Sequence, residues 1–293
     1  MSKFFRALEL AEQNQAPPRL PAPSESIRER GPAPAETVPH RALPSPLEVP
    51  RGGARGIEEH LVSLLEPTSF AAEQYRVLRH LIEQLHKSTD LSVVAVSSAG
   101  VADGKTTTAI NLAGALAQAP DARVLLVDAD LRVPALATRL GCDTRPGLVD
   151  AILDGDLALE AVVQVRPTLN LSVLAAGQPP SAPYEVLKSP RVGGLLAEAR
   201  RRYDYIVLDL PPLVSVPDGR VIGKLVDGFL IVVAAHRTSR QLLEEALSIP
   251  EARKVVGLVF NGDDRHLSRN SYESYASRHS WGRNGRKETA SDD

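Results

Sequence analysis

Apolar residues of this chain gather in short uninterrupted runs, and stretches with helical spacing separate each run from the next. We predict strands over residues 91–97, 123–127, 169–175, 205–210, 229–234 and 255–260. Continuous rather than alternating apolar runs are typical of strands buried on both faces. We predict helices over residues 68–86, 104–118, 146–153, 183–202, 219–225 and 239–247. This alternation predicts an α/β fold, in which a mainly parallel sheet is flanked by helices on both faces.

The pattern changes toward both ends of the chain and divides it into four regions. Residues 1–13 carry apolar side chains at helical spacing and predict a short amphipathic helix, which either docks on a partner or a membrane surface or frays without a role. Residues 14–56 hold ten of the 23 prolines and predict a disordered linker, because they bury too little apolar surface to offset their ordering entropy. We assign a folded ATPase-like domain to residues 57–264 and a flexible basic tail to residues 265–293.

Composition narrows the class of protein. The net charge of −2 over 293 residues gives no reason to expect a nucleic-acid partner. Cys142 is the single cysteine, so the chain forms no internal disulfide and suits a reducing cytoplasm. No apolar stretch approaches the ~20 residues that span a bilayer, and the first residues lack the features of a signal peptide. We therefore expect a cytoplasmic protein that reaches the inner face of the plasma membrane through a partner or a surface contact.

Residues that suit phosphate binding follow the first predicted strand. The segment from Ala99 to Thr107 reads Ala-Gly-Val-Ala-Asp-Gly-Lys-Thr-Thr and opens the next predicted helix. Glycine lets backbone N–H groups curl around phosphate oxygens, and a helix N-terminus adds positive potential there. Lys105 is placed to reach the β- and γ-phosphates, and the Thr106 hydroxyl is placed to bind Mg²⁺. The candidate cofactor-binding residues are Gly100, Val101, Ala102, Asp103, Gly104, Lys105, Thr106 and Thr107.

Two further segments place carboxylates at the ends of predicted strands. Asp128 and Asp130 follow the second predicted strand, and Asp209 follows the apolar run 205–208. Carboxylates as close as the first two repel each other unless a cation lies nearby, and Mg²⁺ meets that need. A carboxylate beside the metal can also accept the proton of an attacking hydroxyl or water. The three segments together predict a site for a nucleoside triphosphate and Mg²⁺ at one edge of the sheet.

These segments resemble the Walker A, A′ and B motifs of the bacterial tyrosine kinases of capsule and exopolysaccharide loci, which share a P-loop fold with the partitioning ATPases. Over residues 65–262 the resemblance is carried by Asp128–Arg132 and Asp209–Pro212, with further matches at 130–134, 147–150, 176–177 and 226–228. It implies that ATP and Mg²⁺ are cofactors, with catalytic residues Asp128, Lys105 and Asp130 and metal ligands Thr106, Asp128, Asp130 and Asp209. In this assignment the carboxylate of Asp128 is the base for a tyrosine hydroxyl.

The resemblance extends to residues that concern assembly and the phosphate acceptor. Glu73, Arg76 and Arg79 match the E-x₂-R-x₂-R motif through which the family assembles into rings, and a helix would place them on one face. Tyr272 and Tyr275 in the tail are the implied phosphoacceptors, used by a neighbouring subunit. The family normally carries a larger tyrosine cluster. The resemblance also implies a separate membrane activator, or chain-length determinant protein, of a polysaccharide export system.

The chain departs from the family in the phosphate loop, and three functions stay open. Val101-Ala102 stands where the kinases usually have Pro-Gly, which changes the backbone freedom of the loop. The first function is a tyrosine autokinase. The second is an ATP-hydrolysing assembly switch of the partitioning type, which the altered loop and few tyrosines favour. The third is a degenerate nucleotide-binding scaffold, which the intact lysine and aspartates oppose. The partitioning ATPases carry a signature lysine where this chain has Gly100, which favours the kinase. Asn261 is either an adenine contact or a simple turn residue.

Overall fold

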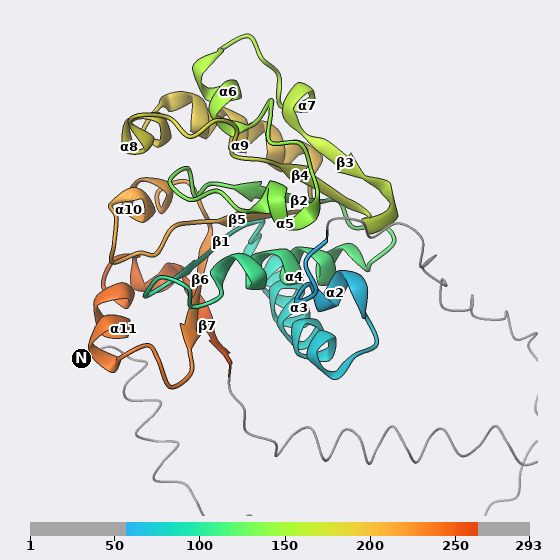
Figure 1. The fold of residues 1–293 in the computed structure, drawn as a ribbon, viewed down its shortest axis with the longest axis vertical. Coiled ribbons are helices and arrows are strands. Elements are labelled where there is room, and N and C mark those ends of the chain that lie inside the picture. The colour runs from blue at the N-terminus through green and yellow to red at the C-terminus, as the bar shows by residue number, and fades with distance from the viewer. Residues whose placement is uncertain (1–56, 263–293) are drawn as a thin grey trace, which may run out of the picture. The chain divides into compact units, whose positions relative to one another are not determined.

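A seven-stranded sheet with the order β3-β4-β2-β5-β1-β6-β7 organises residues 57–262, the part of the chain that the computed structural model describes (Figure 1). The strands are β1 (Val93–Ser98), β2 (Val124–Asp128), β3 (Gln164–Arg166), β4 (Leu171–Leu174), β5 (Tyr205–Asp209), β6 (Gly228–Ala234) and β7 (Val255–Asn261). Neighbouring strands are parallel, except that β3 is antiparallel to β4. The predicted α/β class with a mainly parallel sheet is therefore confirmed.

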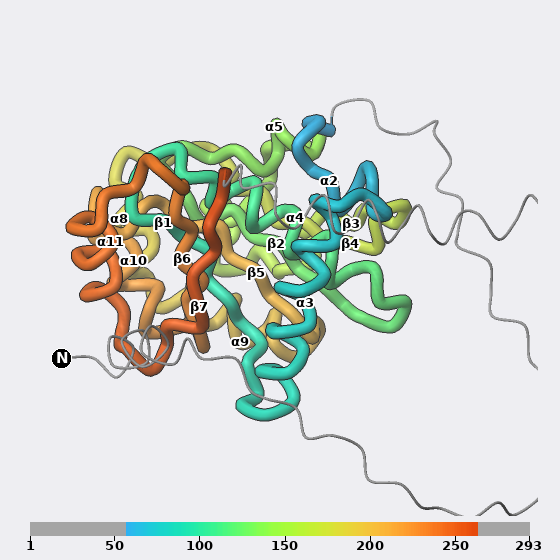
Figure 2. Tube along the Cα trace, turned by 90° about the horizontal axis from the view of Figure 1, so that it is seen from below, coloured from blue at the N-terminus to red at the C-terminus, as the bar shows by residue number. Residues whose placement is uncertain are grey.

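Helices cover both faces of this sheet. One face carries α2 (Val62–Leu65), α3 (Phe70–Thr89), α4 (Lys105–Ala117) and α5 (Leu136–Leu140). The other carries α6 (Leu148–Leu153), α7 (Leu159–Val162), α8 (Pro183–Leu187), α9 (Pro190–Arg202), α10 (Asp218–Ile222) and α11 (Arg240–Leu247). Strand residues alternate between the two layers, so that Leu125 packs on the second layer and Leu126 on the first. Figure 2 shows β7 at the sheet edge, with α11 on one side and α3 on the other.

Local sequence signals explain where the helices begin and end. Ser69 caps α3 by accepting the N–H of Ala72, and Asp90 ends it in a left-handed conformation with φ 54°. The single helix predicted over residues 183–202 is wrong, because the structure divides it into α8 and α9 at Pro190. Proline has no N–H to donate and its ring crowds the preceding turn, so a new helix starts there with Ser189 as its cap.

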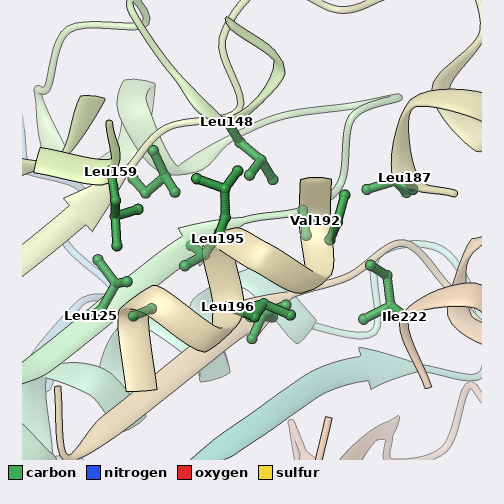
Figure 3. Close-up of a pocket in the computed structure, with 13 residues that line it drawn as sticks. Leu125, Leu148, Leu159, Leu187, Val192, Leu195, Leu196 and Ile222 are labelled. Atoms are coloured by element: carbon green, nitrogen blue, oxygen red, sulfur yellow. The ribbon is translucent and has the colours of Figure 1, made fainter. Parts of the chain in front are cut away.

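The core beneath α9 is built from aliphatic side chains of the sheet and of the surrounding helices. A cavity of about 20 Å³ lies there, lined by aliphatic side chains that include Leu125, Leu148, Leu187 and Leu195 (Figure 3). The space would admit about one water molecule, yet no polar group faces it to bind that water. This cavity is therefore a packing void inside the core and carries no chemistry.

Several expectations fall on residues that the structure does not describe. The helix over 1–13, the linker over 14–56 and the tail over 265–293 with Tyr272 and Tyr275 all lie outside the described range. The boundaries of the four predicted regions accordingly stay predictions. Within residues 57–262, no helix is both long enough and apolar enough to cross a membrane.

Asn111 joins the first described segment to α4, the helix that follows β1. Its side chain is fully buried, and its Oδ1 accepts the N–H of Ser63 at 2.8 Å. Its Nδ2 donates to the carbonyl of His60 at 3.1 Å and to that of Thr107 at 2.9 Å. Gly114, one turn further along α4, leaves room for Leu64, because a Cβ there would come within 2.6 Å of the leucine side chain. These contacts seat α2 directly on α4.

We expect Asn111→Ala to lower the free energy of unfolding by about 2–3 kcal/mol, because the buried N–H of Ser63 loses its acceptor and the carbonyls of His60 and Thr107 each lose a hydrogen bond. Urea unfolding of the full chain measures this loss. Gln84→Ala, at an exposed position of α3, is the control and should change the value by less than about 0.5 kcal/mol. Equal effects of the two substitutions would contradict the role assigned to Asn111.

Candidate nucleotide-binding site

The sheet brings the three motif segments to one edge. Strands β2, β5 and β1 are direct neighbours, and their register pairs Asp209 with Asp128 on one side and with Val96 on the other. The carboxyl end of β1 continues into the loop of residues 99–104, here called the phosphate loop. Ligands of open parallel sheets bind at such carboxyl ends, where the strand order reverses. The structure therefore brings Lys105 and the aspartates together, as the sequence predicted.

Lys105 lies between two of these carboxylates. Its Nζ is 2.9 Å from Oδ2 of Asp130 and 3.4 Å from Oδ1 of Asp209, and its side chain is mostly buried. Burial alone would lower the pKa of Lys105, but Asp209 and Asp130 outweigh it and raise the pKa above the ordinary value. The amine therefore stays charged and neutralises part of a crowded acidic site.

Asp128 lies beside Asp130 and Asp209, and only one of its two carboxylate oxygens accepts hydrogen bonds within the described residues. Its Oδ2 accepts the N–H groups of Ala135 and Leu136, both at 3.0 Å. Its Oδ1 is buried and has no hydrogen-bond partner among the described residues. Burial and the nearby charge of Asp209 raise the pKa of Asp128 to about 7, although the two N–H groups oppose the shift. Such a carboxylate is poised to accept a proton near neutral pH.

The remaining oxygen donors suit a hard cation. Thr106 donates its hydroxyl to Oδ2 of Asp209 at 2.6 Å. Burial raises the pKa of Asp209 to about 6, while Lys105 and Thr106 hold it down. Residues 57–262 contain no ready cluster of three His, Cys, Asp or Glu side chains for a metal, so phosphate oxygens and water would have to complete the shell. Mg²⁺ binds in this way in proteins, through one or two carboxylates together with phosphate oxygens and water.

The phosphate loop holds two residues in the left-handed region. Gly104 caps α4 with φ 99°, and a Cβ there would come within 2.0 Å of Nδ2 of Asn261. Ala102 has φ 62°, which an alanine adopts at a cost that a glycine avoids. Asp103 is buried and accepts the N–H of Gly100 at 2.8 Å. The first turn of a helix leaves its N–H groups without partners in the helix, and in α4 these include the N–H groups of Lys105 and Thr106.

Asn261 touches the phosphate loop itself. Its Nδ2 donates to the carbonyl of Asp103 at 3.0 Å and lies against Gly104. The observed contact therefore supports the backbone of the loop, and the role as an adenine contact stays a prediction. The side chain of Thr107 also makes a contact within the protein, since its Oγ1 accepts a hydrogen bond from Nη1 of Arg139 at 2.9 Å.

Arg132 makes an ion pair that the sequence did not indicate. Its guanidinium contacts both oxygens of Asp218 at 2.9 and 3.0 Å, and Asp218 is fully buried at the start of α10. The N–H groups of Arg132 and Val133 also donate to Oδ1 of Asp130. The pair therefore ties the loop after β2 to the segment after β5. Asp218 follows a proline and reads as an ordinary helix cap, so no sequence signal joins it to Arg132.

All three predicted assembly residues make contacts within the chain. Arg76 forms an ion pair with Glu73 and also contacts the carbonyl of Pro67. Arg79 pairs with Glu83 at 2.6 Å and donates to the carbonyl of Ala115, in the last turn of α4, at 3.0 Å. All three motif side chains keep between a fifth and about a third of their surface exposed. Their part in assembly stays a prediction. In the structure, the two arginines fasten α3 to the end of α4, through Ala115 and Gln118.

The chain is similar to a family model, to curated proteins and to solved structures. A family model described as an AAA domain matches residues 91–245. The tyrosine-protein kinase YwqD of Bacillus subtilis is 33% identical over 222 residues, covering 75% of this chain and 92% of that protein. The succinoglycan biosynthesis transport protein ExoP of Rhizobium meliloti is 34% identical over 203 residues, which cover 68% of this chain but 26% of ExoP. The solved kinase domain of the Escherichia coli tyrosine kinase ETK matches with a TM-score of 0.64 at 28% identity, covering 70% of this chain and 81% of that domain.

We expect Asp128→Asn to stabilise the nucleotide-free protein at pH 8 and to have little effect near pH 4. Between about pH 4 and 7 the folded wild type keeps a proton on Asp128 that the unfolded chain has released. Its free energy of unfolding therefore falls as pH rises across this range, and the loss is complete once pH has passed about 7. Neutral asparagine removes this loss, which is on the order of 2–4 kcal/mol. Urea unfolding across this pH range, without Mg²⁺, measures it. Asp121→Asn, at an exposed position, is the control, and a parallel pH profile for both variants would refute the burial of charge at Asp128.

We expect Arg132→Ala to lower the free energy of unfolding by about 2–3 kcal/mol, because it leaves the buried carboxylate of Asp218 without its partner. The loss should fall below that of a fully buried pair, because a third of the arginine side chain is exposed. Adding Asp218→Asn should recover part of it by removing the stranded charge. Arg253→Ala, an exposed arginine beside Glu251, controls for the lost positive charge. No recovery in the double variant would contradict the assignment.

Proposed function

Because the chain belongs to the family of bacterial tyrosine-protein kinases, we propose that it transfers the γ-phosphate of ATP to tyrosine hydroxyls. The chain covers nearly the whole of YwqD, which supports the same activity here. ExoP, of which the chain covers about a quarter, supports a place in exopolysaccharide synthesis and export. The proposed role is the regulation of polymer assembly and export by phosphorylation.

The phosphate loop and Lys105 would hold the triphosphate. The unpaired N–H groups at the start of α4 suit the phosphate oxygens, and Lys105 would exchange one carboxylate contact for the β- and γ-phosphates. Thr106, Asp130 and Asp209 would hold Mg²⁺, which neutralises charge on the phosphates when it is bound. The hydrogen bond between Thr106 and Asp209 supports this set, because it places the two donors 2.6 Å apart.

Asp128 carries the proposal of phosphoryl transfer. Its unpartnered Oδ1 is the one buried carboxylate oxygen at this edge, among the described residues, that is free to accept a proton. We assign it as the base: the tyrosine oxygen forms the new bond to the γ-phosphorus, the bond to ADP breaks, and the hydroxyl proton passes to Asp128. Its pKa of about 7 suits a base that must be ionised near neutral pH.

The acceptor and the partners belong to the same proposal. Tyr272 and Tyr275 follow β7, and that strand ends at Asn261 against the phosphate loop. We propose that a neighbouring subunit of a homo-oligomeric ring phosphorylates them, and that Glu73, Arg76 and Arg79 contribute to the ring. A membrane protein of a polysaccharide export system is the proposed activator. Each phosphate would add negative charge to a basic tail and so change its contacts.

A mixing experiment with full-length chains tests the transfer. Lys105→Ala should abolish phosphotyrosine formation with ATP and Mg²⁺, while Lys188→Ala, at an exposed lysine, should leave it unchanged. The variant Tyr272→Phe/Tyr275→Phe keeps the site but lacks the acceptors. When the two inactive chains are mixed, phosphotyrosine should reappear on the Lys105→Ala chain, which supplies acceptors to the intact site of the other.

The outcomes separate the functions. Phosphotyrosine that survives loss of both tail tyrosines would overturn the acceptor assignment, and failure of the mixture would overturn transfer between subunits. ATP hydrolysis without phosphotyrosine, even with an activator fragment present, would refute the kinase and leave the assembly switch. Asp128→Asn should reduce the rate of transfer at least about a hundredfold, as loss of a general base does, while nucleotide binding persists.

A further inference from the structure

Arg237 is an exposed arginine whose side chain reaches the phosphate loop. It follows β6 in a tight turn, in which the N–H groups of Arg237 and Thr238 both donate to the carbonyl of Ala234. The hydroxyl of Thr238 closes the turn by accepting the N–H of Ala234 at 3.0 Å. His236 within the turn has φ 63°, a left-handed conformation that side chains other than glycine rarely adopt. The backbone of the turn is thus firmly held, which fixes the direction in which Arg237 leaves it.

The guanidinium of Arg237 binds two successive carbonyls of the loop. Its Nη2 donates to the carbonyl of Ala102 at 3.0 Å and to that of Val101 at 3.3 Å. The same nitrogen is 3.8 Å from Oδ1 of the buried Asp103. Since a peptide group is planar and trans, holding a carbonyl also fixes the N–H on the opposite side of the same group. Arg237 therefore sets the orientation of the N–H groups of Ala102 and Asp103.

These two peptide groups flank the strained residue of the loop. Ala102 has φ 62°, a left-handed conformation that is less favourable for alanine than for glycine, because the alanine Cβ crowds the following carbonyl. A left-handed residue is what makes successive N–H groups point into one concavity that binds anions. A glycine would hold this shape without assistance. With alanine in place, relaxation to a negative φ would turn the N–H groups away unless a contact opposes it.

We propose that Arg237 is a positioning residue of the phosphate loop, and that its two hydrogen bonds keep Ala102 in the left-handed conformation that phosphate binding requires. The inference rests on the proposed binding of ATP at this loop. It gives Arg237 a function through the backbone and none through contact with the nucleotide. Arg237 thereby compensates, within this chain, for the absence of glycine at position 102.

A double-mutant cycle on the full chain separates these two modes of action. The affinity for Mg²⁺-ATP is measured for the wild type, Arg237→Ala, Ala102→Gly and the double variant. Arg237→Ala should weaken binding about fivefold to tenfold, which is the net scale of an ordinary solvent-exposed hydrogen bond. In the Ala102→Gly background the same change should cost at most about twofold, because glycine holds the loop unaided. Arg237→Lys should fall between these values, and Arg253→Ala, which removes an exposed charge elsewhere, should leave affinity unchanged.

Equal losses in both backgrounds would overturn the proposal, because they would mean that Arg237 contacts the nucleotide or acts by its charge. No loss in either background would overturn it as well. If the wild type itself bound no ATP, the proposed function would fail, and amide hydrogen exchange of the loop in the nucleotide-free protein would decide this inference separately. Arg237→Ala should then speed exchange of the Gly100 N–H, which Asp103 accepts, in the alanine background and much less in the glycine background.

Discussion

The structure depends on how it manages three carboxylates at adjacent strand ends. Asp128 and Asp209 face each other across paired strands, and Asp130 lies two residues beyond the first. All three are buried, so their mutual repulsion and lost hydration would be prohibitive without a cation. Lys105 supplies one positive charge, yet burial keeps the pKa of Asp128 and of Asp209 above the ordinary value of a carboxyl. A divalent cation brought in with a triphosphate would add positive charge where these carboxylates crowd together.

Backbone N–H groups and an arginine ion pair around this unfavourable cluster hold it in place. The loop after β2 donates four N–H groups to Asp128 and Asp130, so the carboxylates cannot swing out to water. Arg132 fastens that loop to Asp218 beyond β5, and on the opposite layer Asn111 fastens α4. Each fastening uses a buried polar group whose partners are satisfied within the fold, which is what makes the geometry rigid.

Elements marked by a long apolar run or a motif could be predicted from the sequence. Elements and contacts that depend on residues far away in the chain could not. Continuous apolar runs located six of the seven strands, whereas β3 has three residues with no apolar run and forms because β4 offers it an edge. The motif spacing predicted which of Lys105, Thr106 and the aspartates would meet, because parallel strands bring their carboxyl ends together. No comparable rule could join Arg132 to Asp218, which are 86 residues apart. Likewise, helical spacing put Arg76 and Arg79 on one face, but only the packing of α3 on α4 shows what that face contacts.

The altered phosphate loop shows why a motif cannot be judged residue by residue. Read alone, alanine at position 102 argues for a damaged loop, since the left-handed conformation favours glycine. In the fold, the loop is held from two neighbouring strands, by Arg237 after β6 and by Asn261 at the end of β7. The strain of one residue is therefore shared with contacts that lie more than 130 residues away in the chain. The conformation of this phosphate loop therefore depends on the ends of three strands, β1, β6 and β7, and its capacity to bind phosphate has to be judged from all three together.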